Sequence, residues 1–347
     1  MKFYNYFIDN FAINIGAAIG MLLLILFFRN VALKIGLVDV PNARKIHSNP
    51  VPMVGGLALF MMSALLLPVV SAVNIFSFYL VLASGLIVTI GLLDDLYQLS
   101  AFWRFLIQIL ASLIVIYFSQ IQLHTFGFLL NSSWDLYLGV FAIPFTVFGV
   151  VGVINALNMA DGVDGLAAMT FSLPVFVLIG LSSQSTFNLW LFILLICVVV
   201  FVFFNKTSKY KIFLGDNGSL LLGFILAWLL VYFSQGESAP IKPVSALYLV
   251  ALPVYDTIFV MLRRLFKRRS PFKPDKTHLH HLFLAQKLSH TQVLMAMMFC
   301  QSVFIFLGVF FLEIKLAEHL QFYIFVGISA LYYHIVKNVW SRINLKD

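Results

Sequence analysis

The hydrophobic positions of this chain gather into long apolar runs that alternate with short polar stretches. A helix needs about 20 mostly apolar residues to cross a bilayer, and about eleven of the runs are long enough. These runs cover residues 11–28, 53–73, 76–93, 102–118, 136–154, 166–181, 187–204, 219–233, 244–262, 293–312 and 320–336. The pattern predicts an all-α integral membrane protein, a polytopic bundle of about eleven transmembrane helices in a single domain, residues 1–347.

Composition agrees with a membrane protein, because 62% of the 347 residues are hydrophobic and only 10% are charged. That leaves little room for a soluble domain. The first run has no basic segment before it and no small-residue cleavage site, so we expect a retained span and not a signal peptide.

The net charge of +8 would suit nucleic acid, but the positions of the basic residues point to a membrane instead. When alternate loops are assigned to opposite sides, every Lys and Arg except Lys2, Lys242 and Lys315 falls on one side. This is the positive-inside pattern, and it argues against a nucleic-acid partner. It predicts a cytoplasmic C-terminus and, with an odd number of spans, an N-terminus outside.

A polar stretch, residues 155–166 (NALNMADGVDGL), interrupts the apolar pattern at the cytoplasmic end of the fifth run. Asn158, Asp161 and Asp164 follow at three-residue intervals, so a helix would bring them near one face, where they could converge on a cation or polar ligand. Ionisable residues at membrane depth are candidates for function. A plain polar loop between spans is the alternative.

Two adjacent carboxylates, Asp94 and Asp95, end the third run. Their charges repel, and a magnesium ion or a bound proton would relieve the repulsion. Neighbouring residues on a helix point about 100° apart, so we expect one to face the site and the other to bind a neighbouring basic group. Arg104 is a candidate phosphate contact, although a basic residue at the head of a span also serves as a topology marker.

Asp216 lies in the sequence FLGDNGS, between Gly215 and Gly218, at the entrance to the eighth run. Free backbone N–H groups at a helix start can receive an anion, and the carboxylate of Asp216 can bind a metal. A simple N-cap aspartate explains part of this pattern but not the two glycines.

Basic side chains mark the first cytoplasmic loop, where Lys45 and His47 stand among Pro and Gly residues that hold an irregular backbone. An ordinary positive-inside loop is the alternative there.

The largest loop, 263–290, begins with a basic cluster containing Arg264 that is dense enough to bind anionic headgroups. Three histidines follow, His278, His280 and His281. Metal binding by these histidines and contact with a polyphosphate both remain open.

All of these candidates lie on one predicted membrane face, in loops at about 29–52, 94–104, 155–165, 205–218 and 263–290. A transport pathway should instead place ionisable groups at mid-membrane and show repeated halves, and the sequence has neither. A site on one face, rich in carboxylates, basic residues and glycine, suits phosphoryl transfer with magnesium. Such a site would join a cytosolic nucleotide donor to a lipid of the inner leaflet.

Five stretches occur in the order DVPNARKIHSNPVPMVGG, GLLDDLYQLS, NALNMADGVDGL, FLGDNGS and SPFKPDKTHLHHL. Together they resemble the polyprenyl-phosphate N-acetylhexosamine-1-phosphate transferase family (glycosyltransferase family 4). They look closest to the branch that uses UDP-GlcNAc and undecaprenyl phosphate, since DDLYQLS lacks the Lys-rich continuation usual in the branch that uses UDP-MurNAc-pentapeptide. Lys276 stands where Arg is common, which weakens bidentate phosphate binding there, and Leu279 stands where Ile is common.

The resemblance implies transfer of GlcNAc-1-phosphate from UDP-GlcNAc to undecaprenyl phosphate, with release of UMP and with Mg²⁺ or Mn²⁺. The reaction would take place at a bacterial inner membrane, as the first membrane step of O-antigen or enterobacterial common antigen-type glycan synthesis. Asn158 and Asp216 would hold the metal, while Asp94 would deprotonate or orient the lipid phosphate with Asp95 beside it. The residues implied to bind substrate are Lys45, His47, Arg104, Asn155, Asp161, Asp164, Arg264, His278, His280 and His281.

Two alternatives stay open at the level of the sequence. One keeps the chemistry and changes the donor to another UDP-N-acetylhexosamine or to UDP-MurNAc-pentapeptide. The other is a transporter that binds polyprenyl lipids or sugars without chemistry. Direct attack and a covalent aspartyl intermediate are equally compatible with the sequence. Membrane lipids are expected partners, and a homodimer is compatible with the sequence.

Overall fold

The computed structural model describes residues 2–40, 49–70, 72–183, 185–207, 209–237, 239–266, 268 and 277–344. The chain forms two compact units. Unit 1 comprises residues 1–121 and 171–228, and unit 2 comprises residues 122–170 and 229–347. Helices α7 (Leu166–Leu181) and α9 (Asp216–Ser234) have residues in both units.

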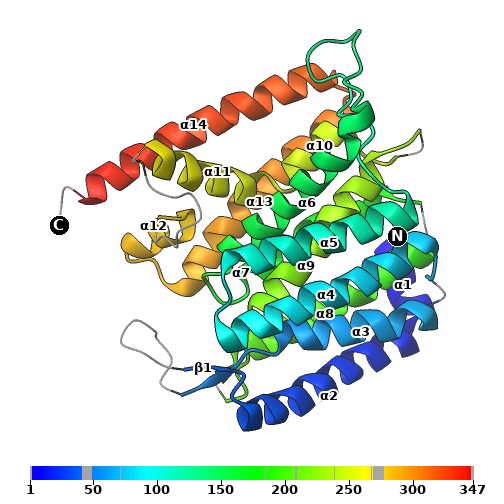
Figure 1. Ribbon diagram of the computed structural model, residues 1–347, viewed down its shortest axis with the longest axis vertical. Coiled ribbons are helices and arrows are strands. Elements are labelled where there is room, and N and C mark those ends of the chain that lie inside the picture. Colours follow the sequence, from blue (N-terminus) through cyan, green and yellow to red (C-terminus); the bar gives the residue numbers. More distant parts are fainter. Residues whose placement is uncertain are drawn as a thin grey trace. The chain divides into compact units, whose positions relative to one another are not determined.

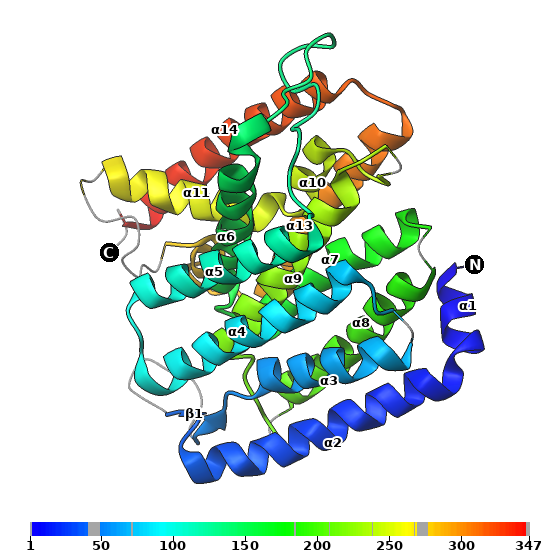
Figure 2. The ribbon, with the colours of Figure 1, turned by 45° about the vertical axis from the view of Figure 1, so that its right-hand side comes forward.

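Unit 1 is built from long apolar helices that lie side by side. Helices α2, α3, α4 and α5 run next to one another in both views (Figures 1 and 2). A short helix before the first predicted span, α1, was not expected from the sequence. Besides its parts of α7 and α9, the unit contains α1 (Lys2–Asp9), α2 (Phe11–Ile35), α3 (Gly55–Val69), α4 (Ile75–Tyr97), α5 (Ala101–Ser119) and α8 (Ser185–Lys206).

The first loop of unit 1, predicted to be cytoplasmic, is more regular at its edges than expected. Strand β1 (Val38–Asp39) pairs in antiparallel fashion with β2 (Val51–Pro52). The chain leaving β2 then lies along residues 213–214, because the Gly55 N–H donates to the Phe213 carbonyl at 3.0 Å. This pairing attaches the start of α3 to the segment that leads into α9. The predicted binding residues Lys45 and His47 fall between residues 41 and 48, outside the described part of the chain.

Unit 2 combines long helices with short ones. Helix α12 packs against α13 and α14, and α11 packs against α6 and α13. The unit contains η1 (Gly139–Phe141), α6 (Ala142–Ala160), α10 (Pro243–Leu249), α11 (Ala251–Phe266), α12 (Leu279–Ala285), α13 (His290–Glu313) and α14 (Glu318–Asn344).

A break divides the ninth predicted run into α10 and α11, which meet at 80°. Pro253 explains the break, because in a continuous helix its ring would collide with the carbonyl of Leu249, four residues earlier. The side chain of Gln301 from α13 donates to that carbonyl at 2.5 Å. The break is thus compensated by a hydrogen bond from a neighbouring helix.

The protein is an all-α polytopic membrane protein, but the predicted count of eleven spans is not confirmed. Every predicted run contains a helix. In the described part of the chain, eight helices are long and apolar enough to cross a membrane, or nine if α10 and α11 form one bent span. The other two, α3 and α7, have only 15 and 16 residues.

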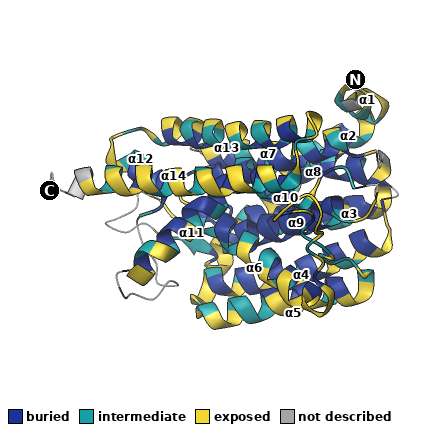
Figure 3. Ribbon diagram, turned by 90° about the horizontal axis from the view of Figure 1, so that it is seen from above, coloured by how far each residue is buried: buried dark blue, intermediate teal, exposed yellow. Residues whose placement is uncertain are grey.

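The surface of these helices has the character expected next to lipid. Large apolar side chains such as Phe299 and Phe306 on α13 are 71% and 66% exposed. Helix α9 is different, because 94% of its 18-residue apolar window is buried (Figure 3). A helix that is apolar all round and buried belongs to the interior of a bundle.

Candidate active site

The carboxylate of Asp94 is paired with a residue of the next helix. Helix α4 ends at Tyr97, where Gln98 takes a left-handed conformation with φ of 52°. A three-residue turn then leads into α5, so the end of α4 and the start of α5 are neighbours. Arg104 Nη1 consequently lies 2.9 Å from Asp94 Oδ2, and only 6% of the Asp94 side chain is exposed.

Asp95, the next residue, binds a different element. Its Oδ1 accepts the backbone N–H of Asp216 at 2.9 Å, and its Oδ2 accepts the N–H of Asn217 at 3.2 Å. Asn217 Nδ2 donates to the same Oδ2 at 2.6 Å and to the Met53 carbonyl at 3.1 Å. A carboxylate at a helix start satisfies N–H groups that lack a partner within the helix and is favoured by the helix dipole. Asp95 therefore holds the start of α9.

Two glycines allow α9 to come this close. A Cβ atom on Gly91, one turn before the paired aspartates, would collide with the backbone of Asn217. A Cβ atom on Gly56, at the start of α3, would collide with the backbone of Gly218. A side chain at either position would push the start of α9 away.

Asp216 brings a third carboxylate to the same place. Its Oδ2 lies 3.7 Å from Arg104 Nη1, the atom that also pairs with Asp94. The Asp216 side chain is 37% exposed and that of Arg104 is 28% exposed. We define the acidic cluster as Asp94, Asp95, Arg104 and Asp216. In this cluster the Asp216 carboxylate is accessible, the Arg104 guanidinium lies beside it, and the Asp94 carboxylate is buried.

In unit 2, a buried carboxylate orients the first histidine of the histidine cluster (His278, His280 and His281). Asp256, which is 3% exposed, places Oδ2 2.8 Å from His278 Nδ1. Its Oδ1 accepts the Leu279 N–H at 2.8 Å and the Tyr332 hydroxyl at 3.0 Å. Because the carboxylate lies at Nδ1, the imidazole orientation is set and Nε2 is the nitrogen left for a ligand.

His280 is enclosed in the same cluster. Its ring centroid lies 5.8 Å from that of His278 and 4.2 Å from that of His281. Gly162, in the turn after α6, lies so close that a Cβ atom there would collide with the His280 ring. Burial, followed by repulsion from His281 and His278, lowers the pKa of His280 to about 3. This imidazole is therefore neutral at physiological pH.

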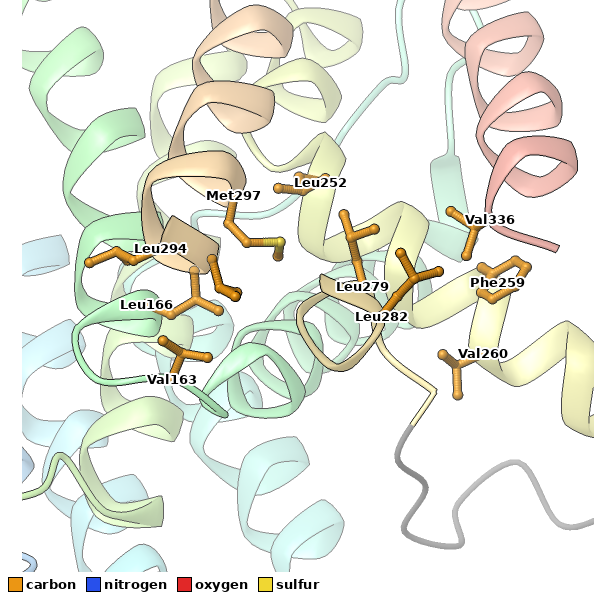
Figure 4. Close-up of a cluster of buried hydrophobic side chains, with 11 residues drawn as sticks. Val163, Leu166, Leu252, Phe259, Val260, Leu279, Leu282, Leu294, Met297 and Val336 are labelled. Carbon is orange, nitrogen blue, oxygen red and sulfur yellow. The ribbon is translucent and has the colours of Figure 1, made fainter. Parts of the chain in front are cut away.

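An apolar cluster fixes both the histidines and the turn after α6 (Figure 4). Leu279 and Leu282 of α12 pack with Val163 and Leu166 from the polar stretch 155–166. These side chains are between 0% and 6% exposed. The apolar residues between the polar ones therefore bring the histidine cluster and the polar stretch 155–166 together in unit 2.

Comparison with known proteins gives a consistent answer. The sequence model of glycosyl transferase family 4 matches residues 77–234. The undecaprenyl-phosphate alpha-N-acetylglucosaminyl 1-phosphate transferase of Escherichia coli (strain K12) is 34% identical over 334 residues, 92% of this chain and 89% of that protein. The proteins of the same name from Yersinia pestis and Pasteurella multocida (strain Pm70) are each 34% identical, over 90% and 93% of this chain and 87% and 92% of their own lengths.

The chain belongs to glycosyl transferase family 4. It is therefore an enzyme, a membrane-embedded transferase, and the family assignment made from the five sequence stretches is confirmed.

The polar stretch of this family 4 transferase is only partly helical. Asn155 and Asn158 lie in the last turns of α6, which ends at Ala160. Asp161 follows as the C-cap and Asp164 lies in the turn before α7. Glycines on both sides of Asp164 favour a turn here, so the helical face proposed for the three polar residues does not form. Gly162 instead brings the turn against His280.

Further expectations about the transferase need correction. The first two N–H groups of α9 are not free for an anion, because Asp95 accepts both. The histidine cluster does not form a metal site by itself. Within the described ranges, no three His, Cys, Asp or Glu side chains are placed to hold a metal ion. His280 is also too enclosed, at 1% exposed, to meet a polyphosphate directly.

Arg264, a predicted phosphate contact, is 5% exposed in the last turn of α11.

Sequence reasoning gave no role to Asp256, Asn217 or Tyr332. Asp256 is an ionisable residue inside an apolar run, which is itself a signal of function or of a buried partner. Asn217 stands beside Asp216 in the same glycine-flanked motif. Tyr332 carries no signal of its own, since a tyrosine in an apolar helix is usually a packing residue.

A divalent cation fits the acidic cluster of the family 4 transferase. Magnesium prefers oxygen ligands and commonly takes one or two carboxylates together with water and substrate phosphates. Asp94 and Asp216 supply carboxylates that both lie near Arg104 Nη1, and Asp216 is accessible. A metal site completed by substrate would not need a third protein ligand.

We expect Gly91→Ala to destabilise the protein by about 1–3 kcal/mol, because the new methyl group meets the backbone of Asn217 and overpacks the contact. Thermal unfolding of the detergent-purified protein measures the effect. Gly16→Ala is the matched control, since nothing lies within 4 Å of a Cβ atom there. Equal unfolding temperatures for both variants would mean that α9 does not depend on this approach.

We expect His280 to make stability depend on pH. Its pKa falls from 6.5 when unfolded to about 3 when folded. The unfolded chain thus binds the extra proton first, so stability is complete above pH 6.5 and is lost as the pH falls toward 3. The loss between pH 7 and pH 5 is about 2 kcal/mol.

Unfolding temperatures at pH 7 and pH 5 test this expectation. His280→Gln should show a smaller decrease than the parent protein, whereas the exposed His334→Gln should decrease as the parent does. An unchanged decrease in His280→Gln would remove His280 as the cause.

Proposed function

We propose that this chain transfers GlcNAc-1-phosphate from UDP-GlcNAc to undecaprenyl phosphate at a bacterial inner membrane. The names of its relatives support the undecaprenyl phosphate acceptor and the N-acetylglucosaminyl 1-phosphate group, and two of these proteins are 34% identical to this chain over 92% and 93% of its length. The UDP donor is proposed from the family resemblance. The acidic cluster is the single structural observation that carries the proposal. An accessible carboxylate and a guanidinium beside a second carboxylate suit a reaction between two phosphates.

In the net reaction, an oxygen of the lipid phosphate forms a bond to the phosphorus that carries the sugar. The bond between that phosphorus and the oxygen bridging to the uridine phosphate breaks. The electron pair leaves with the bridging oxygen, which becomes part of UMP. The products are GlcNAc-pyrophosphoryl-undecaprenol and UMP.

Asp216 would hold the magnesium or manganese ion, which when bound neutralises charge on the donor pyrophosphate. Arg104 would turn from the carboxylates to a substrate phosphate as that phosphate arrives. Asp94 would then be left unpaired beside the lipid phosphate, which it would orient or deprotonate. Asp95 has a positioning role, because both of its oxygens are engaged by the start of α9.

In unit 2, His278 would present Nε2 to a phosphate, oriented by Asp256 through Nδ1. Roles for Asn155, Asn158, Asp161, Asp164 and Arg264 in seating the nucleotide or the metal remain proposals from the family resemblance. The same resemblance supports a place as the first membrane step of O-antigen or enterobacterial common antigen-type glycan synthesis, with the site on the cytoplasmic side.

Release of UMP by purified protein tests the proposed reaction. We expect release that needs UDP-GlcNAc, undecaprenyl phosphate and Mg²⁺ together, and that stops with EDTA. Activity only with another UDP-N-acetylhexosamine or with UDP-MurNAc-pentapeptide would keep the chemistry and change the donor. Lipid or sugar movement without UMP release, and no reaction with any donor, would identify a transporter and refute the proposal.

Substitutions in the acidic cluster test the roles of its members. We expect Asp216→Asn and Asp94→Asn each to lower turnover about a hundredfold or more at a temperature where both variants remain folded, because each removes charge needed in the reaction. Asp94→Asn also breaks the Asp94–Arg104 ion pair, so its unfolding temperature should fall as well. Asp95→Asn should also lower the unfolding temperature, since an amide replaces one of two acceptors at the start of α9. Near-normal turnover in both Asp216→Asn and Asp94→Asn would exclude them from the mechanism.

A further inference from the structure

A pocket lies in unit 2 at the opposite end of α13 from the histidine cluster. It has a volume of about 540 Å³ and is formed by the end of α13, the start of α14, and residues near 128 and 242. Helix α12 packs at the other end of α13, where Leu279 and Leu282 share an apolar cluster with Val293 and Leu294. The proposed reaction uses none of the pocket residues.

The pocket has a fixed apolar side. Phe128, Phe311 and Leu316 line it, and Phe311 and Leu316 belong to an apolar cluster around Tyr248. The Tyr248 hydroxyl donates to the backbone carbonyl of Gln321 at 2.6 Å, which ties α10 to the first turn of α14. This wall is therefore part of the packed interior of unit 2 and not a loose surface.

Three polar groups on the pocket wall point to a ligand. Lys242 and Lys315 are both exposed and form no ion pair with any residue in the described ranges. Gln321 is only 2% exposed and uses its Nε2 to donate to the Leu316 carbonyl at 2.7 Å. Its buried Oε1 has no hydrogen-bond partner. A buried acceptor without a partner costs free energy, so a hydroxyl or N–H donor in the pocket would stabilise it.

One acidic residue of the pocket is already engaged. Glu318 Oε2 accepts the backbone N–H of Phe128 at 3.1 Å, and Gly127 beside it has a φ of 76°, which leaves room for the carboxylate. Glu318 thus fastens the loop before α6 to the start of α14. The two lysines remain as the charged groups that face a ligand.

The pocket lies at the depth of lipid headgroups. Helix α13 has 24 residues and is therefore about 36 Å long, against a hydrocarbon thickness of about 30 Å. Its two ends then lie at opposite membrane faces. Exposed aromatic residues lie in two segments that contribute to the pocket: Trp134 (55% exposed) and Tyr137 (68%) in the loop that carries Phe128, and Tyr323 (52%) on α14. Tyr and Trp are enriched at this level of a membrane.

We propose that this pocket binds the headgroup of an anionic phospholipid, a phosphodiester with free hydroxyl groups. The ammonium groups of Lys242 and Lys315 would bind the phosphate, and a headgroup hydroxyl would donate to Gln321 Oε1. An acyl chain would leave along Phe311 and Leu316. The charge pattern of the sequence puts both lysines on the outer face, so this site is separate from the proposed reaction and does not depend on it.

Native mass spectrometry of the detergent-purified protein, titrated with dioleoyl phosphatidylglycerol or dioleoyl phosphatidylcholine, tests the proposal. We expect Lys242→Gln/Lys315→Gln to weaken phosphatidylglycerol binding at least fivefold and to leave phosphatidylcholine binding unchanged. Gln321→Met should weaken phosphatidylglycerol binding by about threefold. The matched control is Lys287→Gln/Lys337→Gln, which removes the same charge from exposed lysines toward the other ends of α13 and α14.

Several outcomes would overturn the lipid site. Phosphatidylglycerol binding that is unchanged in the pocket variant, or that falls equally in the control, would show that the pocket does not select the lipid. Displacement by glycerol 1-phosphate at the same concentration as the lipid would indicate a site for soluble phosphates. A variant that unfolds at the same temperature as the parent protein is folded. If the double lysine variant does not fold, lipid binding by Gln321→Met tests the pocket independently.

Discussion

The contact between the Asp95 carboxylate and the start of α9 is the interaction on which the acidic cluster depends. It fixes the first turn of a helix that is buried along nearly its whole length, and so fixes Asp216. The same contact is reinforced by Asn217, which reaches both Asp95 and the Met53 carbonyl. Asn217 therefore joins the end of α4, the start of α9 and the chain after β2. Without this anchor the accessible carboxylate would have no fixed distance from Arg104.

The same device appears in unit 2. Asp256 accepts the N–H of Leu279 at the start of α12 and also fixes the ring of His278. In each unit, a carboxylate from one helix satisfies the start of another and places a polar side chain beside it. Asn217 and Leu279 are 0% and 6% exposed, so water does not reach these helix starts and their N–H groups need a partner from the protein. Asp95 and Asp256 thus have a structural task at a helix start, which explains why there are more carboxylates than the proposed reaction needs.

Much of this arrangement was predictable from the sequence, and particular residues show where prediction fails. Apolar runs located every helix of spanning length in the described ranges, because burial in lipid demands apolar side chains. The run 53–73 was longer than α3, whereas the run 166–181 coincides with α7, which at 16 residues is shorter than a span usually needs. The adjacent pair Asp94 and Asp95 could be expected to diverge from helix geometry alone. Which of them would meet Arg104 could not, since that depends on the three-residue turn between α4 and α5.

Long-range partners were the other gap. Asp95 and Asp216 are 121 residues apart, and Asp256 and Tyr332 are 76 apart, so no local pattern links them. Glycines gave the only hint. Gly91 and Gly162 each stand where a neighbouring segment leaves no space for a Cβ atom, and from sequence they only fall within the apolar run 76–93 and the polar stretch 155–166. Close approach of two backbones is a property of tertiary packing, which a single sequence does not reveal.

Charge balance in the acidic cluster links its structure to the metal it is proposed to use. Three carboxylates and one guanidinium carry a formal charge of −2 when all are ionised. The helix dipole at the start of α9 offsets about half a unit of this. Arg104 neutralises the cluster only in part, and at 28% exposed it is free to shift toward an incoming phosphate. A divalent cation would replace that contribution and bring its own affinity for phosphate oxygens, so arrival of metal and substrate would release Arg104 from Asp94.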